Sequence, residues 1–230
     1  MATAIPTLIV PGFHGSGPDH WQTWLETQLP DCTRIDGINW NEPVLAQWAG
    51  RVREALARAP QPLRIVAHSF GCLAAVIAAA DRPEQVSQLI LVAPADADRF
   101  DCMGLKPDLA LANGRFSLSH VLPRSLQVRG LLIASRNDPW LTFEKATALA
   151  QDWALDLHDA GYAGHINTES SYGPWPKLLK LLAERAAATP AATAPSLRKG
   201  RGSALAAVRQ LTREQMQSPQ DHRLWQTASH

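Results

Sequence analysis

The sequence predicts an α/β fold, in which a doubly wound, mostly parallel sheet of six strands is flanked by helices. Short apolar runs of strand length alternate with longer segments whose apolar residues recur at helical spacing. Turns rich in Gly and Pro separate these segments. Such alternation is typical of parallel sheets with right-handed crossovers, which bind ligands beyond the carboxyl ends of their strands. With 230 residues, 46% of them hydrophobic, the chain can bury a substantial core.

The N-terminal part of the chain is expected to hold three strands and three helices. A Pro-Gly turn ends the first apolar run, and Pro residues end the first two helices. Asp19 is the expected cap of the first helix, because its side chain can accept hydrogen bonds from free N–H groups. The third helix is alanine-rich and follows the third strand after only a few residues. The expected strands are 7–10, 32–35 and 63–67, and the expected helices are 20–29, 44–59 and 73–80.

The C-terminal half is expected to complete the sheet. Residues 95–125 contain Gly and Pro with patchy apolar content, which indicates a long excursion and a partial lid rather than a standard crossover. Thr142 is the expected cap of the helix that follows the fifth strand. The expected strands are 86–92, 128–134 and 154–158, and the expected helices are 142–153 and 175–188.

The residues after the last helix of this pattern are expected to form a tail. Residues 1–185 would form the globular domain, and 186–230 a linker and a basic tail that is partly helical or disordered. Ala, Thr and Pro dominate 186–195, which is a linker composition. A helix is predicted over 203–217 from the spacing of its apolar residues. Residues 183–230 hold seven Lys or Arg against three Asp or Glu, net +4, so the tail offers a docking segment for a protein partner.

The overall charge and the cysteines argue against several classes of protein. A formal net charge of +1 gives no reason to expect nucleic acid or a membrane as a partner. No apolar run approaches the roughly 18 residues of a membrane helix, and the first six residues lack the features of a secretory signal. Cys32, Cys72 and Cys102 are widely spaced and form no Cys-x-x-Cys pattern, which argues against a disulfide framework and a zinc site. We therefore expect a protein of a reducing compartment, the cytoplasm.

Ser69 lies on the sharpest turn that the sequence predicts. An apolar strand ends just before it and a helix begins just after it, so its side chain is lifted clear of the sheet. Ala67 stands where the general Gly-x-Ser-x-Gly pattern has its first Gly, and its methyl group is small enough for strand and helix to pack closely. The first N–H groups of the helix would stabilise charge that develops on a substrate oxygen. A lone serine in such a turn is more often a cap, so its role depends on partners.

Two later loops supply those partners. A serine hydroxyl needs a base that takes its proton and an acid that orients the base. Asp138 follows the expected strand 128–134, and His165 lies in a glycine-containing loop after the last strand. Both loops leave the carboxyl ends of strands, where the ligand site of such a sheet lies. The order Ser, Asp, His along the chain is the order of α/β-hydrolases.

Other residues remain alternatives for these two roles. Asp96 and Asp98 follow the preceding strand and are rivals for the acid. Asp138 could serve only an Asx-turn before the proline that follows it. His158 is the weaker candidate for the base, because a strand commits its ring to one face of the sheet, whereas His165 is in a loop.

Five short motifs, separated along the chain, carry a further resemblance. They are Pro11-Gly12-Phe13, Asp19-His20-Trp21, Val66-Ala67-His68-Ser69-Phe70-Gly71, Ser135-Arg136-Asn137-Asp138-Pro139 and Gly164-His165-Ile166-Asn167. In order and spacing they resemble the small YdeN-like serine hydrolases, the family that includes retinoblastoma-binding protein 9. The resemblance spans about residues 5–182. It implies a compact α/β-hydrolase with Ser69 as nucleophile, Asp138 as acid and His165 as base, and with the backbone N–H groups of Phe70 and Phe13 as oxyanion donors.

Neighbouring residues are assigned supporting roles. His14 and Trp140 are candidates for the substrate pocket. His68, Asp19 and His20 are expected to pack behind the nucleophile and to brace the oxyanion loop. His14 and His20, with Asp19 beside them, have no further ligand at a useful spacing, so no metal is expected, and no cofactor either.

The sequence therefore predicts a serine hydrolase that cleaves a small ester, thioester or amide through an acyl-enzyme on Ser69, with carboxylesterase as the first class to test. The alternative is a protein-interaction module that retains the fold with weak or no turnover. The intact order of the three residues argues against it, because a scaffold role requires none of them. Lyase or dehalogenase chemistry is a weaker option, since a dehalogenase would need a carboxylate in place of Ser69.

Overall fold

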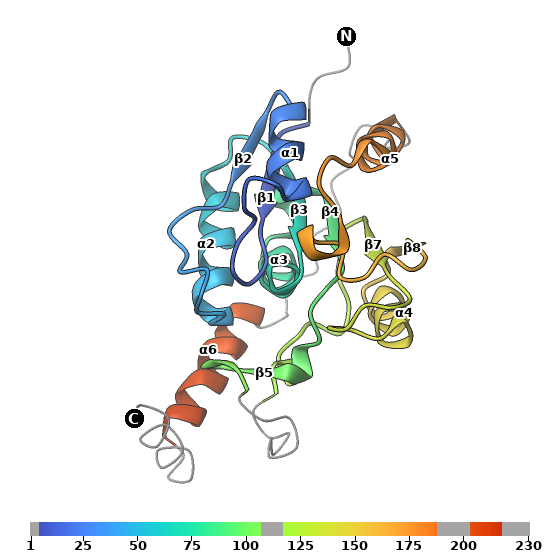
Figure 1. The fold of residues 1–230 in the computed structure, drawn as a ribbon. Coiled ribbons are helices and arrows are strands. Elements are labelled where there is room, and N and C mark those ends of the chain that lie inside the picture. The colour runs from blue at the N-terminus through green and yellow to red at the C-terminus, as the bar shows by residue number, and fades with distance from the viewer. Residues whose placement is uncertain (1–4, 107–116, 188–202, 218–230) are drawn as a thin grey trace.

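The computed structural model describes residues 5–106, 117–187 and 203–217 and contains a parallel sheet of six strands (Figure 1). The strands are β1 (Thr7–Val10), β2 (Cys32–Arg34), β3 (Leu63–His68), β4 (Val86–Val92), β7 (Gly130–Ala134) and β8 (Asp156–Asp159). They lie in the order β2-β1-β3-β4-β7-β8, and every neighbouring pair is parallel. The predicted doubly wound α/β sheet is confirmed.

The strand order reverses between β1 and β3. β1 pairs with β2 on one side, and the next strand along the chain, β3, pairs with β1 on the other. In open α/β sheets the ligand site lies at such a reversal, outside the carboxyl ends of the strands. The loops that leave β1 and β3 therefore meet at the edge where a ligand is expected.

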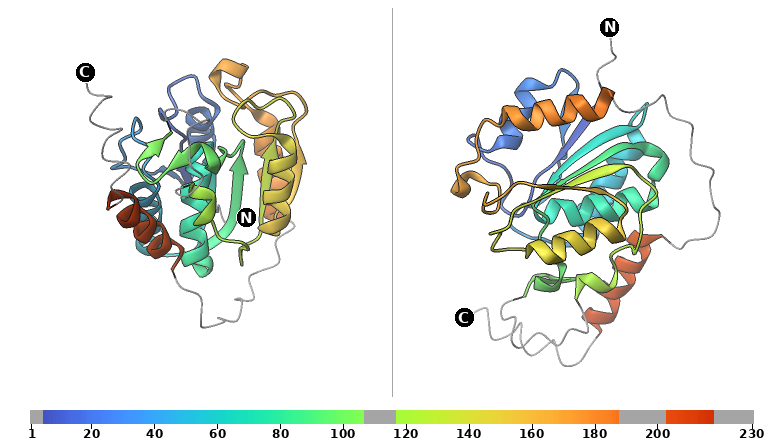
Figure 2. Two further views of the ribbon diagram at one scale, coloured as in Figure 1. Left: turned by 90° about the horizontal axis from the view of Figure 1, so that it is seen from below. Right: turned by 90° about the vertical axis from the view of Figure 1, so that its right-hand side faces the viewer.

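Helices cover both faces of the sheet (Figure 2). They are α1 (Trp21–Gln28), α2 (Leu45–Arg58), α3 (Phe70–Asp81), α4 (Phe143–Asp152) and α5 (Pro176–Ala187). Alternate strand residues belong to two buried clusters: in β3, Val66 packs with α1 and α5, whereas Ile65 and Ala67 pack with α2, α3 and α4. Because both faces are covered, the central strands are near-continuous apolar runs, which is the signal that predicted them.

Helix α1 begins one residue later than the sequence predicted. His20 is its N-cap, and ring Nδ1 of His20 accepts a hydrogen bond from the backbone N–H of Gln22 at 3.1 Å. Asp19, the expected cap, is exposed and lies outside the helix. The prediction was wrong because an imidazole lone pair satisfies a free N–H group of the first turn as a carboxylate does.

The excursion after β4 contains a small antiparallel hairpin of β5 (Phe100–Asp101) and β6 (Gly104–Leu105). Phe100 is buried and packs on Phe70, with ring centroids 4.8 Å apart. The excursion therefore reaches the residue next to Ser69. Residues 107–116 lie outside the described residues, and a lid stays a prediction. Short 3-10 turns lie at Pro83–Gln85, Ala97–Arg99, Leu118–His120 and Thr168–Ser170.

The predicted C-terminal helix is present as α6 (Ala204–Met216) and packs on α2 and α3 (Figure 1). Leu205 and Val208 are buried in the same cluster as those helices, whereas Met216 is exposed. Residues 188–195 of the predicted linker (186–195) lie outside the described residues, and residues 186 and 187 belong to the end of α5. Within the part of the chain that the structure describes, every helix is too short or too polar to cross a membrane.

Candidate active site

Ser69 lies between β3 and α3 in a backbone conformation that few residues adopt. Its φ of 53° and ψ of −125° cost a residue other than glycine about 1–3 kcal/mol. Helix α3 begins directly after it at Phe70, three residues earlier than the sequence predicted. Gly71 permits this start, because a Cβ there would lie 2.2 Å from the carbonyl oxygen of Pro11. The strain and the close approach lift the Ser69 hydroxyl above the carboxyl end of the sheet.

Ser69, His165 and Asp138 form a continuous series of hydrogen bonds. Oγ of Ser69 lies 2.8 Å from Nε2 of His165. Nδ1 of His165 lies 2.9 and 3.0 Å from the two carboxylate oxygens of Asp138. Because a carboxylate only accepts, Nδ1 carries a proton, and Nε2 presents its lone pair to the serine hydroxyl. Ser69 and His165 are 8% and 7% exposed, so little water competes for these bonds. The structure brings together the three residues that the sequence singled out.

The alternative acids and the alternative base lie elsewhere. Asp96 and Asp98 accept hydrogen bonds from Nζ of Lys145 at 2.7 and 3.1 Å. Side-chain hydrogen bonds, the largest from Ser119, hold the pKa of Asp98 at about 2. His158 is exposed on the edge strand β8. The geometry therefore favours Asp138 and His165 over these rivals.

Two backbone N–H groups near the serine have no hydrogen-bond partner among the described residues. The N–H of Phe70 opens α3 and cannot pair within the helix. Among the hydrogen bonds between described residues, none uses the N–H of Phe70 or Phe13. A Cβ on Gly12 would lie 2.7 Å from Cβ of Ser69, so the loop that carries Phe13 lies directly against the nucleophile. These are the two donors that the family resemblance implied.

Asn137 and Ser135 join the loop of the acid to the loop of the base. Oδ1 of Asn137 accepts from the N–H of Gly164 at 2.8 Å and from the hydroxyl of Ser135 at 2.9 Å. Oγ of Ser135 accepts from the N–H of Ala163 at 2.9 Å. The position of His165, which follows Gly164, depends on these bonds. The sequence placed Asn137 and Ser135 in a motif but assigned them no role; an Asn beside an Asp in a turn was the only signal.

His68, the residue before the nucleophile, holds the backbone of the base. Its Nε2 donates to the carbonyl oxygen of His165 at 3.0 Å, and the two rings are 5.0 Å apart. Burial lowers the pKa of His68 well below its usual value, so the ring stays neutral at neutral pH. A neutral neighbour adds no positive charge that would oppose proton uptake by His165. His68 lies behind the nucleophile, where the sequence analysis expected it.

His20 and Trp21 extend this support to the start of α1. The His20 ring is buried 5.0 Å from the His68 ring, and burial lowers the pKa of His20 to about 4. Nε1 of Trp21 donates to the carbonyl oxygen of Ile166 at 2.8 Å. This bond holds the residue after the base, whose φ is 49°. Asp19 does not join the group, because its side chain is exposed.

Gln22 is a buried polar residue that the sequence analysis missed. Its Nε2 donates to the carbonyl oxygens of Val10 and Val66, each at 3.2 Å, and its Oε1 accepts from the hydroxyl of Ser16 at 2.6 Å. Val10 ends β1 and Val66 lies near the end of β3. Gln22 thus joins the two strands that lead to the oxyanion loop and to Ser69. A glutamine beside the apolar face of the predicted helix was the available signal.

The two candidates for the substrate pocket lie next to different parts of the site. The Trp140 ring is 5.9 Å from the His165 ring, and the Trp140 backbone N–H donates to Asp138 at 2.8 Å. His14 is exposed and stacks on Phe13 at 3.8 Å. Trp140 therefore borders the reacting residues directly, and His14 borders them through the oxyanion loop.

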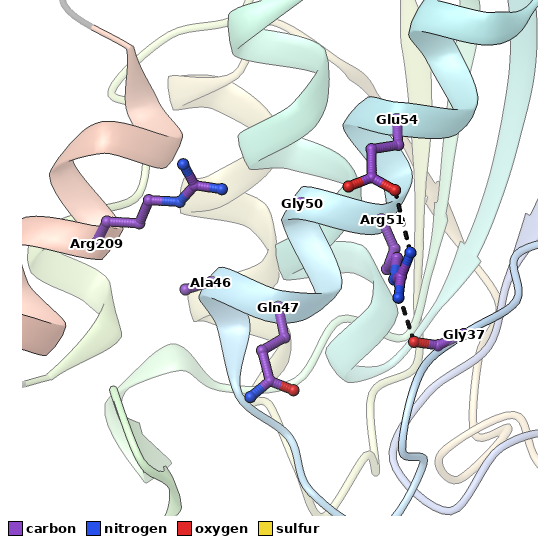
Figure 3. Close-up of a pocket in the computed structure, with 7 residues that line it drawn as sticks. All are labelled: Gly37, Ala46, Gln47, Gly50, Arg51, Glu54 and Arg209. Carbon is purple, nitrogen blue, oxygen red and sulfur yellow. Dashed lines mark hydrogen bonds and ion pairs between the residues drawn. The ribbon is translucent and has the colours of Figure 1, made fainter.

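A shallow hollow of about 400 Å³ lies away from these residues, between α2 and α6 (Figure 3). Arg51 donates hydrogen bonds there to the carbonyl oxygen of Gly37 and to the carboxylate of Glu54, each at 3.2 Å. Arg209 faces the hollow from α6. Neither Ser69 nor the residues bonded to it line this space, so it is not the binding space of the hydrolytic residues.

The comparison with protein families identifies one match. The sequence model of the serine hydrolase family matches residues 7–184 of this chain. That segment contains all five motifs of the sequence analysis and ends before α6. The comparison with curated proteins found no match.

Solved structures share the fold. A YdeN-like hydrolase from Pectobacterium atrosepticum is 34% identical with a TM-score of 0.69, and the match covers 80% of this chain and 92% of that chain. The ydeN gene product from B. subtilis is 20% identical with a TM-score of 0.61, over 80% of this chain and 100% of that chain. Est1E from Butyrivibrio proteoclasticus, with ferulic acid bound, is 16% identical with a TM-score of 0.59, over 81% of this chain and 91% of that chain. The last two likenesses show the α/β-hydrolase fold alone.

Proposed function

The chain belongs to the serine hydrolase family, and on that premise we propose that it cleaves small carboxylic esters through an acyl-enzyme formed on Ser69. The observation that carries this proposal is the unbroken series of hydrogen bonds from Asp138 through His165 to the hydroxyl of Ser69. A neutral serine hydroxyl attacks a carbonyl carbon efficiently only when a base removes its proton, and this arrangement supplies the base.

In the first half of the reaction, Nε2 of His165 takes the hydroxyl proton while Oγ of Ser69 bonds to the carbonyl carbon of the ester. The carbonyl oxygen becomes negative in the tetrahedral intermediate and accepts hydrogen bonds from the N–H groups of Phe70 and Phe13. Collapse of the intermediate breaks the bond to the alcohol oxygen, which takes the proton from His165. The alcohol leaves, and the acyl group stays on Ser69.

In the second half, water gives a proton to His165 and attacks the acyl carbon. The second tetrahedral intermediate uses the same N–H donors, and its collapse returns the proton to Oγ of Ser69 and releases the carboxylic acid. Asp138 accepts a hydrogen bond from the Nδ1–H group throughout, stays ionised, and stabilises the imidazolium that forms in each half.

Esters are proposed before amides because an alcohol oxygen leaves with less help from the general acid than an amine nitrogen does. A panel of a phenyl ester, the matching thioester and the matching anilide ranks the three classes by kcat/KM. We expect the ester to react fastest, and a faster anilide would contradict this choice of class.

Replacing Ser69 with Ala tests the nucleophile. The Ser69→Ala variant is expected to lose turnover of p-nitrophenyl acetate and covalent labelling by a fluorophosphonate probe, because no oxygen remains to form the acyl or phosphonyl bond. Ser87→Ala is the matched control, since the Ser87 hydroxyl has no hydrogen-bond partner among the described residues, and it should keep both activities. Labelling that is unchanged in Ser69→Ala would overturn the proposal.

We also propose that the protein works in a reducing compartment, the cytoplasm. Cys32, Cys72 and Cys102 are all unpaired, as cysteines of such compartments usually are. Fractionation of cells that produce the protein tests this location, and recovery outside the cytoplasm would contradict it.

A further inference from the structure

Helix α6 lies outside the segment that matches the serine hydrolase family, yet it is attached to the domain at both of its ends. Its N-terminal end is held by Asp81, the last residue of α3. Oδ1 of Asp81 accepts from the N–H of Ala204 at 2.6 Å, and Oδ2 accepts from the hydroxyl of Ser203 at 2.7 Å. A carboxylate at this position satisfies free N–H groups of the helix and complements its dipole.

The N-terminal half of α6 is also held by apolar packing. Leu205 and Val208 are buried in the cluster that also contains Phe100 and Cys102 of the β5–β6 hairpin. Figures 1 and 2 show α6 beside α2, with the hairpin next to its C-terminal half. The helix therefore bridges the main domain and the hairpin.

The C-terminal end of α6 is held by a buried polar contact. The side chain of Gln215 is 5% exposed, and its Oε1 accepts a hydrogen bond from the backbone N–H of Cys102 at 3.0 Å. Cys102 lies between β5 and β6 and is itself buried. If Gln215 were lost, the N–H of Cys102 would be left without a partner in an interior site, which is costly.

The hairpin in turn contacts the candidate active site through Phe100. The Phe100 ring is fully buried 4.8 Å from Phe70 and 6.4 Å from Trp140. Phe70 follows Ser69 and supplies one oxyanion donor, whereas Trp140 lies beside His165. A shift of Phe100 therefore alters the packing of two side chains that lie beside Ser69 and His165.

We propose that Gln215 is a positioning residue through which α6 sets the acyl-chain selectivity of the site. By holding Cys102, it keeps Phe100 packed on Phe70 and Trp140, and this buried aromatic packing limits the room beside Ser69 to short acyl chains. The proposal rests on the proposed function, because it concerns the acyl group carried by Ser69. Release of the hairpin lets Phe100 move, and longer acyl chains are then accepted.

The experiment compares Gln215→Ala with Gln210→Ala in the full chain. Gln210 lies on the same helix but is exposed, and among the described residues its side chain bonds only to Glu214. Gln210→Ala therefore makes the same chemical change away from the hairpin. Hydrogen exchange of the amides of residues 100–106 is measured by mass spectrometry well below the unfolding midpoint of each variant. We expect exchange about tenfold faster in Gln215→Ala, as expected for loss of one buried hydrogen bond, and unchanged exchange in Gln210→Ala.

The second readout is the ratio of kcat/KM for p-nitrophenyl octanoate to that for p-nitrophenyl acetate. We expect Gln215→Ala to raise this ratio about fivefold, mainly through a lower KM for the octanoate. A general loss of stability would instead lower kcat/KM for both esters and leave their ratio unchanged. Asp81→Ala, which releases the other end of α6, should change the ratio in the same direction.

Unchanged exchange of the hairpin in Gln215→Ala overturns the holding role, and faster exchange with an unchanged ratio overturns the selectivity. If the wild-type protein hydrolyses no ester, the proposed function is refuted. The exchange measurement needs no turnover, so it still tests whether Gln215 holds the hairpin.

Discussion

The base beside Ser69 lies 96 positions further along the chain, and the acid lies 27 positions before the base. All three residues were predictable, because each follows a strand in a turn, and the carboxyl ends of parallel strands meet at one edge of the sheet. The cap His20 and the buried Gln22 were not predictable. The partner of a polar side chain depends on which backbone groups the fold places beside it, and local sequence does not contain that information.

The acid offers the sharpest test at the residue scale. Asp138→Asn is expected to lower kcat for p-nitrophenyl acetate by about 10³- to 10⁴-fold with little change in KM. The amide of Asn can donate a hydrogen bond to Nδ1 of His165, which places the ring proton on Nε2. A protonated Nε2 has no lone pair, so it cannot take the proton of the Ser69 hydroxyl. Steady-state kinetics measure both constants.

Asp96→Asn is the control for this substitution. Asp96 was the rival acid, and its carboxylate is paired with Lys145 rather than with His165. The kcat of Asp96→Asn should stay within about twofold of wild type, since an ion pair at the surface contributes little to stability. Comparable losses in the two variants would rule out the assignment of Asp138 as the acid.

The element that carries the nucleophile is the β3–α3 turn, and its sharpness depends on glycine. Sequence analysis predicted the strand and the helix, but it began the helix three residues late. The early start depends on the approach of Gly71 to the carbonyl oxygens of Val10 and Pro11, at the end of β1. Such an approach of a helix to the end of a strand is a tertiary contact that no local pattern contains.

Gly71→Ala is expected to lower the free energy of unfolding by about 1–3 kcal/mol. A Cβ at this position would lie 2.2 and 2.6 Å from two backbone carbonyl oxygens, which cannot rotate away as a side chain can. Because α3 must shift, Ser69 moves relative to His165, and kcat/KM for p-nitrophenyl acetate should fall at least about tenfold. Urea unfolding followed by tryptophan fluorescence gives the stability.

Gly50→Ala provides the contrast within another helix. Gly50 lies in α2, and a Cβ there would meet no atom within 4 Å. Its free energy of unfolding should rise by about 0.5–1 kcal/mol, because alanine favours the helix over glycine, and activity should be unchanged. Equal effects of the two substitutions would show that the space at Gly71 is not limiting.

At the scale of the whole molecule, the sheet separates two buried clusters, and buried histidines lie at the carboxyl edge between the sheet and α1. His20 is neutral in the folded protein because burial lowers its pKa to about 4, whereas an unfolded histidine has a pKa near 6.5. Between these values the unfolded chain binds more protons, so the folded state is destabilised as pH falls. His68, whose pKa is also lowered by burial, acts in the same direction.

We therefore expect the free energy of unfolding to fall as pH decreases from about 6.5 to about 4, with His20 contributing on the order of 3 kcal/mol. His20→Asn keeps a side chain that can cap α1 but removes the titrating group, and it should flatten this decline. Urea unfolding at several pH values measures the effect. His158→Asn, at an exposed position on β8, should leave the profile as it is in the wild type; a His20→Asn profile parallel to the wild type would count against burial as the cause.

The sequence by itself determined the α/β class, the six strands of the main sheet, the helix at 203–217 and the set of Ser69, Asp138 and His165. Apolar periodicity and turn residues carry this information, and both are local properties of the chain. Only the tertiary structure decided the strand order, the faces that the helices cover, the His20 cap, the Asn137 link between loops and the attachment of α6 to the hairpin through Gln215. Each of these depends on contacts between segments far apart in the sequence, whose partners are chosen by packing and by the need to satisfy buried polar groups.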